Sequence, residues 1–123
     1  MGYQNPQTLR LLDFVKVNYG TDPEFLWAKF PNTSVLRNLG NRKWYGVVNS
    51  VSASKIGIDS DKIIEIVNIR FNKGEAPEIA GNVSGIFLAW HMNKRNWITI
   101  VLDGTLSDEQ LFGLVAQSFE FSK

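Results

Sequence analysis

The residues best suited to chemistry lie together in segment 90–97, which contains the only histidine of the chain. His91 and the cations Lys94 and Arg95 could contact phosphate, and Trp97 could stack on a flat ligand, as could Trp27 and Trp44 elsewhere in the chain. Apolar runs precede and follow it, so the sequence predicts a β-hairpin with this segment at its tip. The candidate residues for binding a nucleic acid or another ligand at this tip are His91, Asn93, Lys94, Arg95 and Trp97.

Metal binding and catalysis are not indicated by this segment. One histidine with no carboxylate beside it does not make a transition-metal site. The chain has no cysteine, which excludes disulfides, thiolate catalysis and iron–sulfur ligation. Neither a base–nucleophile pair nor a carboxylate dyad nor a phosphate-binding glycine loop can be read from the sequence. We therefore expect a protein that is not an enzyme and that carries no metal or cofactor.

Charge and composition set further bounds. The 123 residues are 44% hydrophobic and 20% charged, which predicts one soluble globular domain over residues 1–123. We find no secretory signal and no apolar run near the ~20 residues of a membrane span, so we expect a cytoplasmic protein, with a monomer favoured. The net charge of +1 is too small for a basic field over the whole molecule.

A second basic tip is predicted earlier in the chain. Segment 25–58 carries five cations and no acidic residue. Three of these cations, Arg37, Arg42 and Lys43, flank a turn at Gly40-Asn41 and are further candidates for binding. Two basic hairpin tips could grip a duplex, or they could be ordinary solubilising charges that protect exposed strands.

Two helices are predicted near the ends of the chain. Asn5 can cap a helix over 6–19 that begins at Pro6 and stops at Gly20. Ser107 and Gln110 form a capping-box pattern at the start of a helix over 107–119, with Leu106 and Leu111 placed as a hydrophobic staple. Within the second helix, Ser118 is expected to bond the carbonyl of the preceding turn rather than to act as a nucleophile.

Short β runs separated by turns fill the space between the helices. The predicted strands are Val35–Leu39, Lys43–Val51, Lys62–Phe71, Gly85–His91 and Trp97–Leu102. This order predicts an α+β fold, an antiparallel sheet of about five strands with both helices packed on one face. The other face of the sheet is then partly open.

Alternation along the last hairpin predicts which residues reach the open face. Ile98, Ile100 and Leu102 would face the core, together with Ile86, Leu88 and Trp90 of the preceding strand. A five-residue loop would place His91 opposite Trp97, both on the open face beside Thr99.

Several motifs resemble the MmcQ/YjbR family. They are His-x-Asn-Lys-x-x-Trp over 91–97, Leu-Asp-Gly over 102–104, Ser-Asp-Glu over 107–109, Ser118-Phe119, and the segments 20–27 and 43–46. The resemblance implies a CyaY-like α+β fold and a family commonly labelled as DNA-binding, with the paired hairpins described as a double wing. Asn96 and Phe119 depart from the residues typical of the family. Iron binding, known in the frataxin branch of this fold, does not carry over, because Asp13 is the only acid in the first helix.

Three hypotheses of function follow. The first is a non-enzymatic binding protein that contacts DNA through its two hairpin tips. The second is a small-molecule-binding domain that uses a shallow pocket around His91, Trp97 and Thr99, and the third is a protein contact through the same face. Against all three stand plainer interpretations: His91 hydrogen-bonds its loop, Asn93 adopts a left-handed turn conformation, and Trp27 and Trp44 belong to the core.

Overall fold

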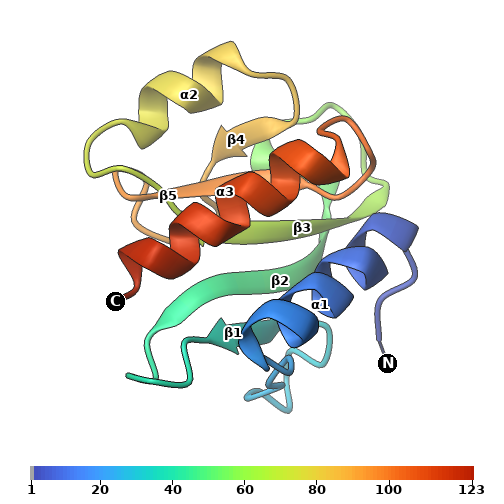
Figure 1. The fold of residues 1–123 in the computed structure, drawn as a ribbon. Helices are drawn as coiled ribbons and strands as arrows, with labels where there is room; N and C mark the ends of the chain where they lie inside the picture. Colours follow the sequence, from blue (N-terminus) through green and yellow to red (C-terminus); the bar gives the residue numbers. More distant parts are fainter. Residues whose placement is uncertain (1) are drawn as a thin grey trace.

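Five strands form one antiparallel sheet in the order β1-β2-β3-β5-β4, and the two terminal helices cover one of its faces (Figure 1). The computed structural model describes residues 2–123. Its elements are α1 (Pro6–Tyr19), β1 (Ser34–Arg37), β2 (Trp44–Ser52), the 3-10 helix η1 (Ala53–Ile56), β3 (Ile63–Arg70), α2 (Ala76–Asn82), β4 (Ile86–Leu88), β5 (Trp97–Val101) and α3 (Asp108–Phe121). The predicted α+β class and the placement of both terminal helices on one face are confirmed, whereas α2 and η1 were not predicted.

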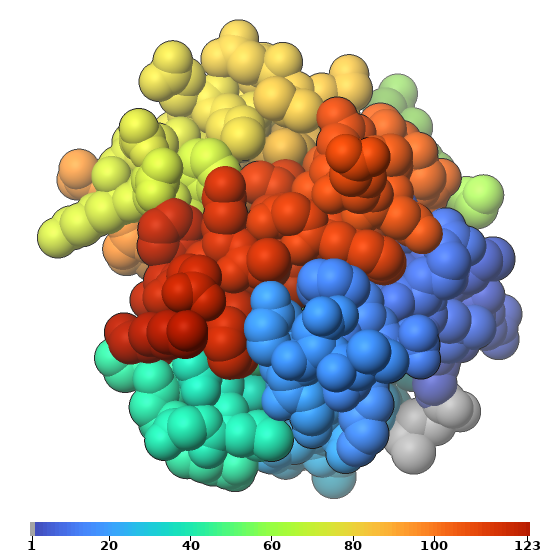
Figure 2. All heavy atoms as spheres, viewed as in Figure 1, coloured from blue at the N-terminus to red at the C-terminus, as the bar shows by residue number. Residues whose placement is uncertain are grey.

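The terminal helices begin where their capping residues predict. The Asn5 side chain accepts a hydrogen bond from the backbone N–H of Gln7, and Gly20 ends α1 in the left-handed conformation. At the start of α3 both bonds of the Ser107–Gln110 capping box are present. Figure 2 shows α1 and α3 side by side across this face of the molecule.

Alternating side chains from the central strands make the core beneath the helices. Val67 and Ile69 of β3 pair with Ile100 and Ile98 of β5, and all four pack in the main buried cluster. Leu11, Val15, Leu111 and Val115 of the helices belong to the same cluster. Burial of each such side chain stabilises the fold by about 1.5–3 kcal/mol. The residues between them in β3 and β5 face the opposite side, as predicted for β5.

A bulge in β2 is bridged by a helix residue. The β1–β2 register shifts between Leu36 and Arg37, which lets Tyr45 turn toward the helices. The Ser118 hydroxyl of α3 donates to the Tyr45 carbonyl at 2.6 Å and accepts from the Arg70 N–H at 2.8 Å. Its predicted bond to the preceding helical turn was therefore wrong, because the bulge leaves a strand donor and acceptor that this hydroxyl joins.

The last hairpin differs from its prediction in length and register. Strand β4 ends at Leu88, which pairs with Ile98, so the extended register puts Ala89 and not His91 level with Trp97. The prediction that His91 lies opposite Trp97 was wrong. Trp90 was also misplaced, because it packs near Ile66 and Val101 on the face away from the helices. A shift of two residues preserves the faces of β4, which explains why Ile86 still joins the core.

Candidate functional site: a tryptophan cleft

The sheet face opposite the terminal helices carries a cleft of about 260 Å³ between two irregular segments. Its floor consists of strand residues, and its walls come from the chain before β1 and from the β4–β5 connection. We call it the tryptophan cleft. It is lined by Trp27, Phe30, Thr33, Trp44, Val47, Asn49, Asn68, Trp90, His91 and Met92.

The first wall is the segment that leads into β1. Glu24 exchanges two backbone hydrogen bonds of 3.0 Å with Val35, which fixes this segment along the edge strand β1. The Phe30 N–H donates to the Trp27 carbonyl at 3.1 Å and closes a turn. The Trp27 ring meets the ring of Trp44 in β2 edge to face at 5.9 Å, so this side of the cleft presents two indoles and the phenyl ring of Phe30.

The second wall is held to the sheet by two buried side chains. The Trp90 N–H donates to Thr99 Oγ1 at 3.0 Å, and the Trp90 carbonyl accepts from Asn68 Nδ2 at 3.0 Å. Thr99 in turn donates its hydroxyl hydrogen to Asn68 Oδ1. These bonds draw the chain out of the strand ladder after Leu88, which is the physical reason that the strand is shorter than predicted.

His91 follows at once, in the left-handed region with φ 58. Its imidazole ring centre lies 4.0 Å from the Trp90 ring and lines the cleft. Within residues 2–123 the imidazole makes no hydrogen bond, so the interpretation that it bonds its own loop has no support in the structure. The left-handed conformation falls on His91 instead of Asn93, whose Oδ1 accepts from the Arg95 N–H at 2.9 Å.

Asn49, in the floor of the cleft, has a side-chain donor group that is not used within residues 2–123. The residue is only 6% exposed. Its Oδ1 accepts from the Thr33 hydroxyl at 2.8 Å and from the Ser50 N–H at 2.9 Å. Its Nδ2 donates no hydrogen bond to the described part of the chain, and the side chain lines the cleft. The Asn49 Nδ2 group is therefore available to donate a hydrogen bond to a ligand in the cleft.

Arginine and tryptophan alternate across one end of the same face. Arg37 of β1 pairs with Trp44 of β2, and Arg70 of β3 pairs with Trp97 of β5. The Arg70 guanidinium carbon lies 4.9 Å from the centre of the Trp97 ring, and Arg70 Nε donates to the Trp44 carbonyl at 2.6 Å. Burial lowers the pKa of Arg70, but a guanidinium remains charged at neutral pH.

Trp97 is thereby removed from the candidate ligand surface. It is 7% exposed, packs against the Arg70 guanidinium and does not line the cleft. The sequence places it on the correct face but gives no sign of the arginine from β3 that packs on it.

The basic residues predicted to bind divide into two groups. Arg37 Nε lies 3.1 Å from Glu24 Oε1, and an Arg42 guanidinium nitrogen lies 3.7 Å from the same oxygen, so one carboxylate offsets part of their charge. Lys43, Lys94 and Arg95 are exposed and make no ion pair within residues 2–123. The connections 38–43 and 89–96 leave the same end of the sheet, because antiparallel pairing brings the ends of β1, β3 and β4 together.

The principal residues that sequence reasoning missed are Phe30, Asn49, Asn68 and Met92, while Trp27 and Trp44 were considered both as stacking residues and as core. A signal was present in Phe25-Leu26-Trp27 and Phe30, four large apolar residues between prolines in a stretch with no helix or strand pattern. All four are at least 36% exposed, which marks the segment as a surface wall.

No group of three or more histidine, aspartate or glutamate side chains in residues 2–123 lies close enough together to hold a metal ion. None of the helices in that range is long and apolar enough to cross a membrane.

Comparison with known proteins decides the family. The YjbR family model matches residues 18–121. The chain belongs to the YjbR family. Its similarity to the uncharacterised protein YyaQ of Bacillus subtilis (strain 168) is 38% identity over 112 residues, which is 89% of this chain and 92% of YyaQ. The match confirms the resemblance seen in the sequence motifs.

Solved structures share the fold of this chain. A crystal structure of a Pseudomonas syringae protein matches with a TM-score of 0.84 and 34% identity, over 98% of this chain and 100% of that one. A crystal structure of a Deinococcus radiodurans protein matches with a TM-score of 0.67 over 96% of this chain and 81% of that one, and at 18% identity it shares the fold alone.

Proposed function

We propose that this YjbR-family protein binds a small planar ligand in the tryptophan cleft. The observation that carries the proposal is the convergence of three tryptophans, a phenylalanine and a histidine on a floor of two buried asparagines. Concave sites with aromatic walls and few convergent polar groups are typical of small-molecule binding. The walls are already in place, because hydrogen bonds hold Trp90 to the sheet and Glu24 to β1.

Absence of a catalytic arrangement favours binding over turnover. Among the residues that line the cleft, His91 is the only one with an acid–base side chain, and no hydroxyl or carboxylate is hydrogen-bonded to it in residues 2–123. We therefore retain the expectation that the protein is not an enzyme as part of the proposal.

Ligand-observed NMR with 1-indanone, a planar bicyclic ketone, tests the proposal. A fragment of about ten heavy atoms can bind with millimolar or tighter affinity. We expect saturation transfer to 1-indanone in the wild-type protein and its loss in Trp27→Ala, which removes part of one wall. Leu26→Ala is the matched control, since Leu26 is exposed to a similar degree but does not line the cleft. Equal signals in the two variants would argue against the cleft.

DNA binding is a second candidate, favoured by one observation. Lys43, Lys94 and Arg95, which make no ion pair within residues 2–123, lie in connections that leave the same end of the sheet. Contacts to phosphate release counterions, so the affinity should fall as salt rises. Fluorescence anisotropy of labelled duplex at two salt concentrations, with a Lys94→Ala, Arg95→Ala double variant, tests this candidate. Binding that is absent at low salt, or unchanged in the variant, would exclude these tips as phosphate contacts.

A further inference from the structure

We infer that the ligand of the tryptophan cleft is a neutral planar molecule that accepts hydrogen bonds, such as a ring ketone, a lactone or a heterocycle with an unprotonated nitrogen. This inference rests on the proposed ligand-binding function and adds the chemical class. It follows from the direction of one buried amide, from the remaining polar groups of the cleft, and from the charge and size of the cleft.

The direction of the Asn49 amide is fixed by its neighbours. A backbone N–H can only donate, so the Ser50 N–H at 2.9 Å requires that the Asn49 oxygen face it. The Thr33 hydroxyl donates a second hydrogen bond to the same Asn49 oxygen, with 2.8 Å between the two oxygens. Nδ2 is then the end of the amide left to the cleft, and it carries two hydrogens with no acceptor in residues 2–123. A carbonyl oxygen or a ring nitrogen of a ligand supplies that acceptor.

The other polar groups of the cleft point to the same class. An indole N–H can only donate, and no indole N–H of the three cleft tryptophans is hydrogen-bonded within the described part of the chain. Asn68 Oδ1 is taken by the Thr99 hydroxyl, while Asn68 Nδ2 uses one hydrogen for the Trp90 carbonyl. Free donors therefore outnumber free acceptors, which favours a ligand rich in acceptors.

Charge and volume narrow the class further. Within residues 2–123 no lysine, arginine, aspartate or glutamate lines the cleft and His91 is its only ionisable side chain, so no permanent charge there compensates a charged ligand. Its volume of about 260 Å³ is below the range of about 300–1,000 Å³ typical of sites for drug-sized ligands. One or two fused rings between the aromatic walls match this space.

The test compares 1-indanone with indane, which has the same bicyclic skeleton without the carbonyl. Dissociation constants are measured by NMR titration of the wild-type protein. One additional hydrogen bond predicts that 1-indanone binds about 3- to 10-fold more tightly than indane. Equal affinities, or tighter binding of indane, would overturn the inference and leave the cleft proposal standing. Failure of both compounds to bind would overturn the proposed function and this inference with it.

Variants at Asn49 locate the preference. Asn49→Leu has nearly the same shape but no donor, and should bind the two compounds with a ratio near one while its affinity for indane is retained. Asn49→Asp keeps the acceptor for the Ser50 N–H and replaces the donor by a second oxygen, so it should disfavour 1-indanone. Binding of indane by a variant shows that the variant is folded. If a variant does not fold, the ratio of the two dissociation constants in the wild-type protein alone decides the inference. A preference that survives in Asn49→Leu would show that the donor to the ligand carbonyl is another group and not the Asn49 amide.

Discussion

Buried polar residues, where apolar ones would be expected, shape the face that carries the cleft. Asn49, Asn68 and Thr99 lie on adjacent strands and are at most 6% exposed. Burying such groups costs free energy unless they are hydrogen-bonded. Asn68 and Thr99 meet this requirement by binding the main chain of Trp90, so their polarity positions a wall of the site. Asn49 meets it only at its oxygen.

Replacing Thr99 by valine should loosen that wall. The change keeps the shape of the side chain and leaves the Trp90 N–H without its acceptor, a loss of about 1–3 kcal/mol. We expect faster amide hydrogen exchange at Trp90 and a lower urea midpoint. Thr105→Val, at an exposed threonine whose hydroxyl makes no hydrogen bond in residues 2–123, is the control. Unchanged exchange at Trp90 in Thr99→Val would contradict this role.

Ser118 has a comparable role on the helix side of the sheet. Ser118→Ala removes the hydroxyl that joins the Tyr45 carbonyl to the Arg70 N–H, and both groups are then left without partners beside the bulge. We expect the free energy of unfolding to fall by about 1–3 kcal/mol. Urea denaturation measures it, with the exposed Ser84→Ala as control. A loss no larger than in Ser84→Ala would show that water replaces the hydroxyl.

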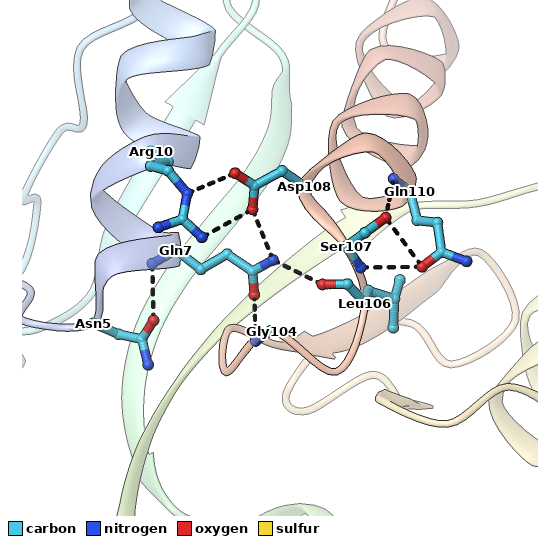
Figure 3. A network of polar contacts seen from close by, with 8 residues as sticks. All are labelled: Asn5, Gln7, Arg10, Gly104, Leu106, Ser107, Asp108 and Gln110. Atoms are coloured by element: carbon cyan, nitrogen blue, oxygen red, sulfur yellow. Dashed lines mark hydrogen bonds and ion pairs between the residues drawn. The ribbon is translucent and has the colours of Figure 1, made fainter.

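At the scale of elements, a polar network joins the two terminal helices (Figure 3). Gln7 of α1 is 2% exposed, donates to the Leu106 carbonyl and to Asp108, and accepts from the Gly104 N–H. Arg10, one turn later, pairs with Asp108 through bonds of 2.5 and 3.1 Å. One side of α1 is thereby tied to the loop and first turn of α3, which fixes how the two helices lie on the sheet.

Asp108 gives this network a dependence on pH. The hydrogen bond from Arg10 lowers the pKa of Asp108 below its usual value of 3.8. Because the folded-state pKa is depressed, the contribution to stability is present above about pH 4 and is lost as the pH falls through the folded pKa. Urea denaturation from pH 6 to pH 2 should show the wild-type and Asp108→Asn proteins converging at acid pH. Asp13→Asn is the control, and a gap that stays constant to pH 2 would contradict this account.

Local signals predict the elements that local bonds define. Asn5, Pro6 and Gly20 specify α1 to the residue, because its caps use neighbours in sequence. Strand β4 was predicted too long because bonds from Asn68 and Thr99, distant in sequence, end it. Helix α2 is short and contains Pro77 and Gly81, so its periodicity is slight.

The candidate site was predicted in part for the same reason. Alternation in β5 indicates which sheet face is uncovered, and that face does carry the cleft. It cannot show that the irregular segment with Trp27 and Phe30 lies against β2, since contacts between residues distant in sequence bring it there, namely the pairing of Glu24 with Val35 and the packing of Trp27 on Trp44. Nor can it show that Arg70 covers Trp97.

For the whole molecule, two buried tyrosines limit stability in alkali. Burial raises the pKa of Tyr3 and of Tyr45 to about 12, against 10.0 for a free phenol. Because these pKa values are raised, the stability they confer is complete below about pH 10 and is lost as the pH rises through about 12. Ultraviolet absorbance at pH 11 should show that both phenols are largely protonated in the folded protein and ionised in the protein unfolded by urea. Full ionisation of all three tyrosines in folded protein at pH 11 would contradict this.

The two faces of the sheet therefore have different tasks. The face under α1 and α3 holds the main core, and the opposite face holds buried polar groups, aromatic walls and an unused amide donor. The four tryptophans all belong to the second face and distinguish the cleft from its surroundings, because three of them line the cleft and Trp97 is packed under Arg70.

The most direct test is an NMR titration of the four indole N–H signals with 1-indanone, assigned by single tryptophan-to-phenylalanine variants. We predict that the signals of Trp27, Trp44 and Trp90 shift in a saturable way with one dissociation constant, while that of Trp97 moves least. No saturable shift, or a shift confined to Trp97, would contradict the assignment of the tryptophan cleft as the ligand site.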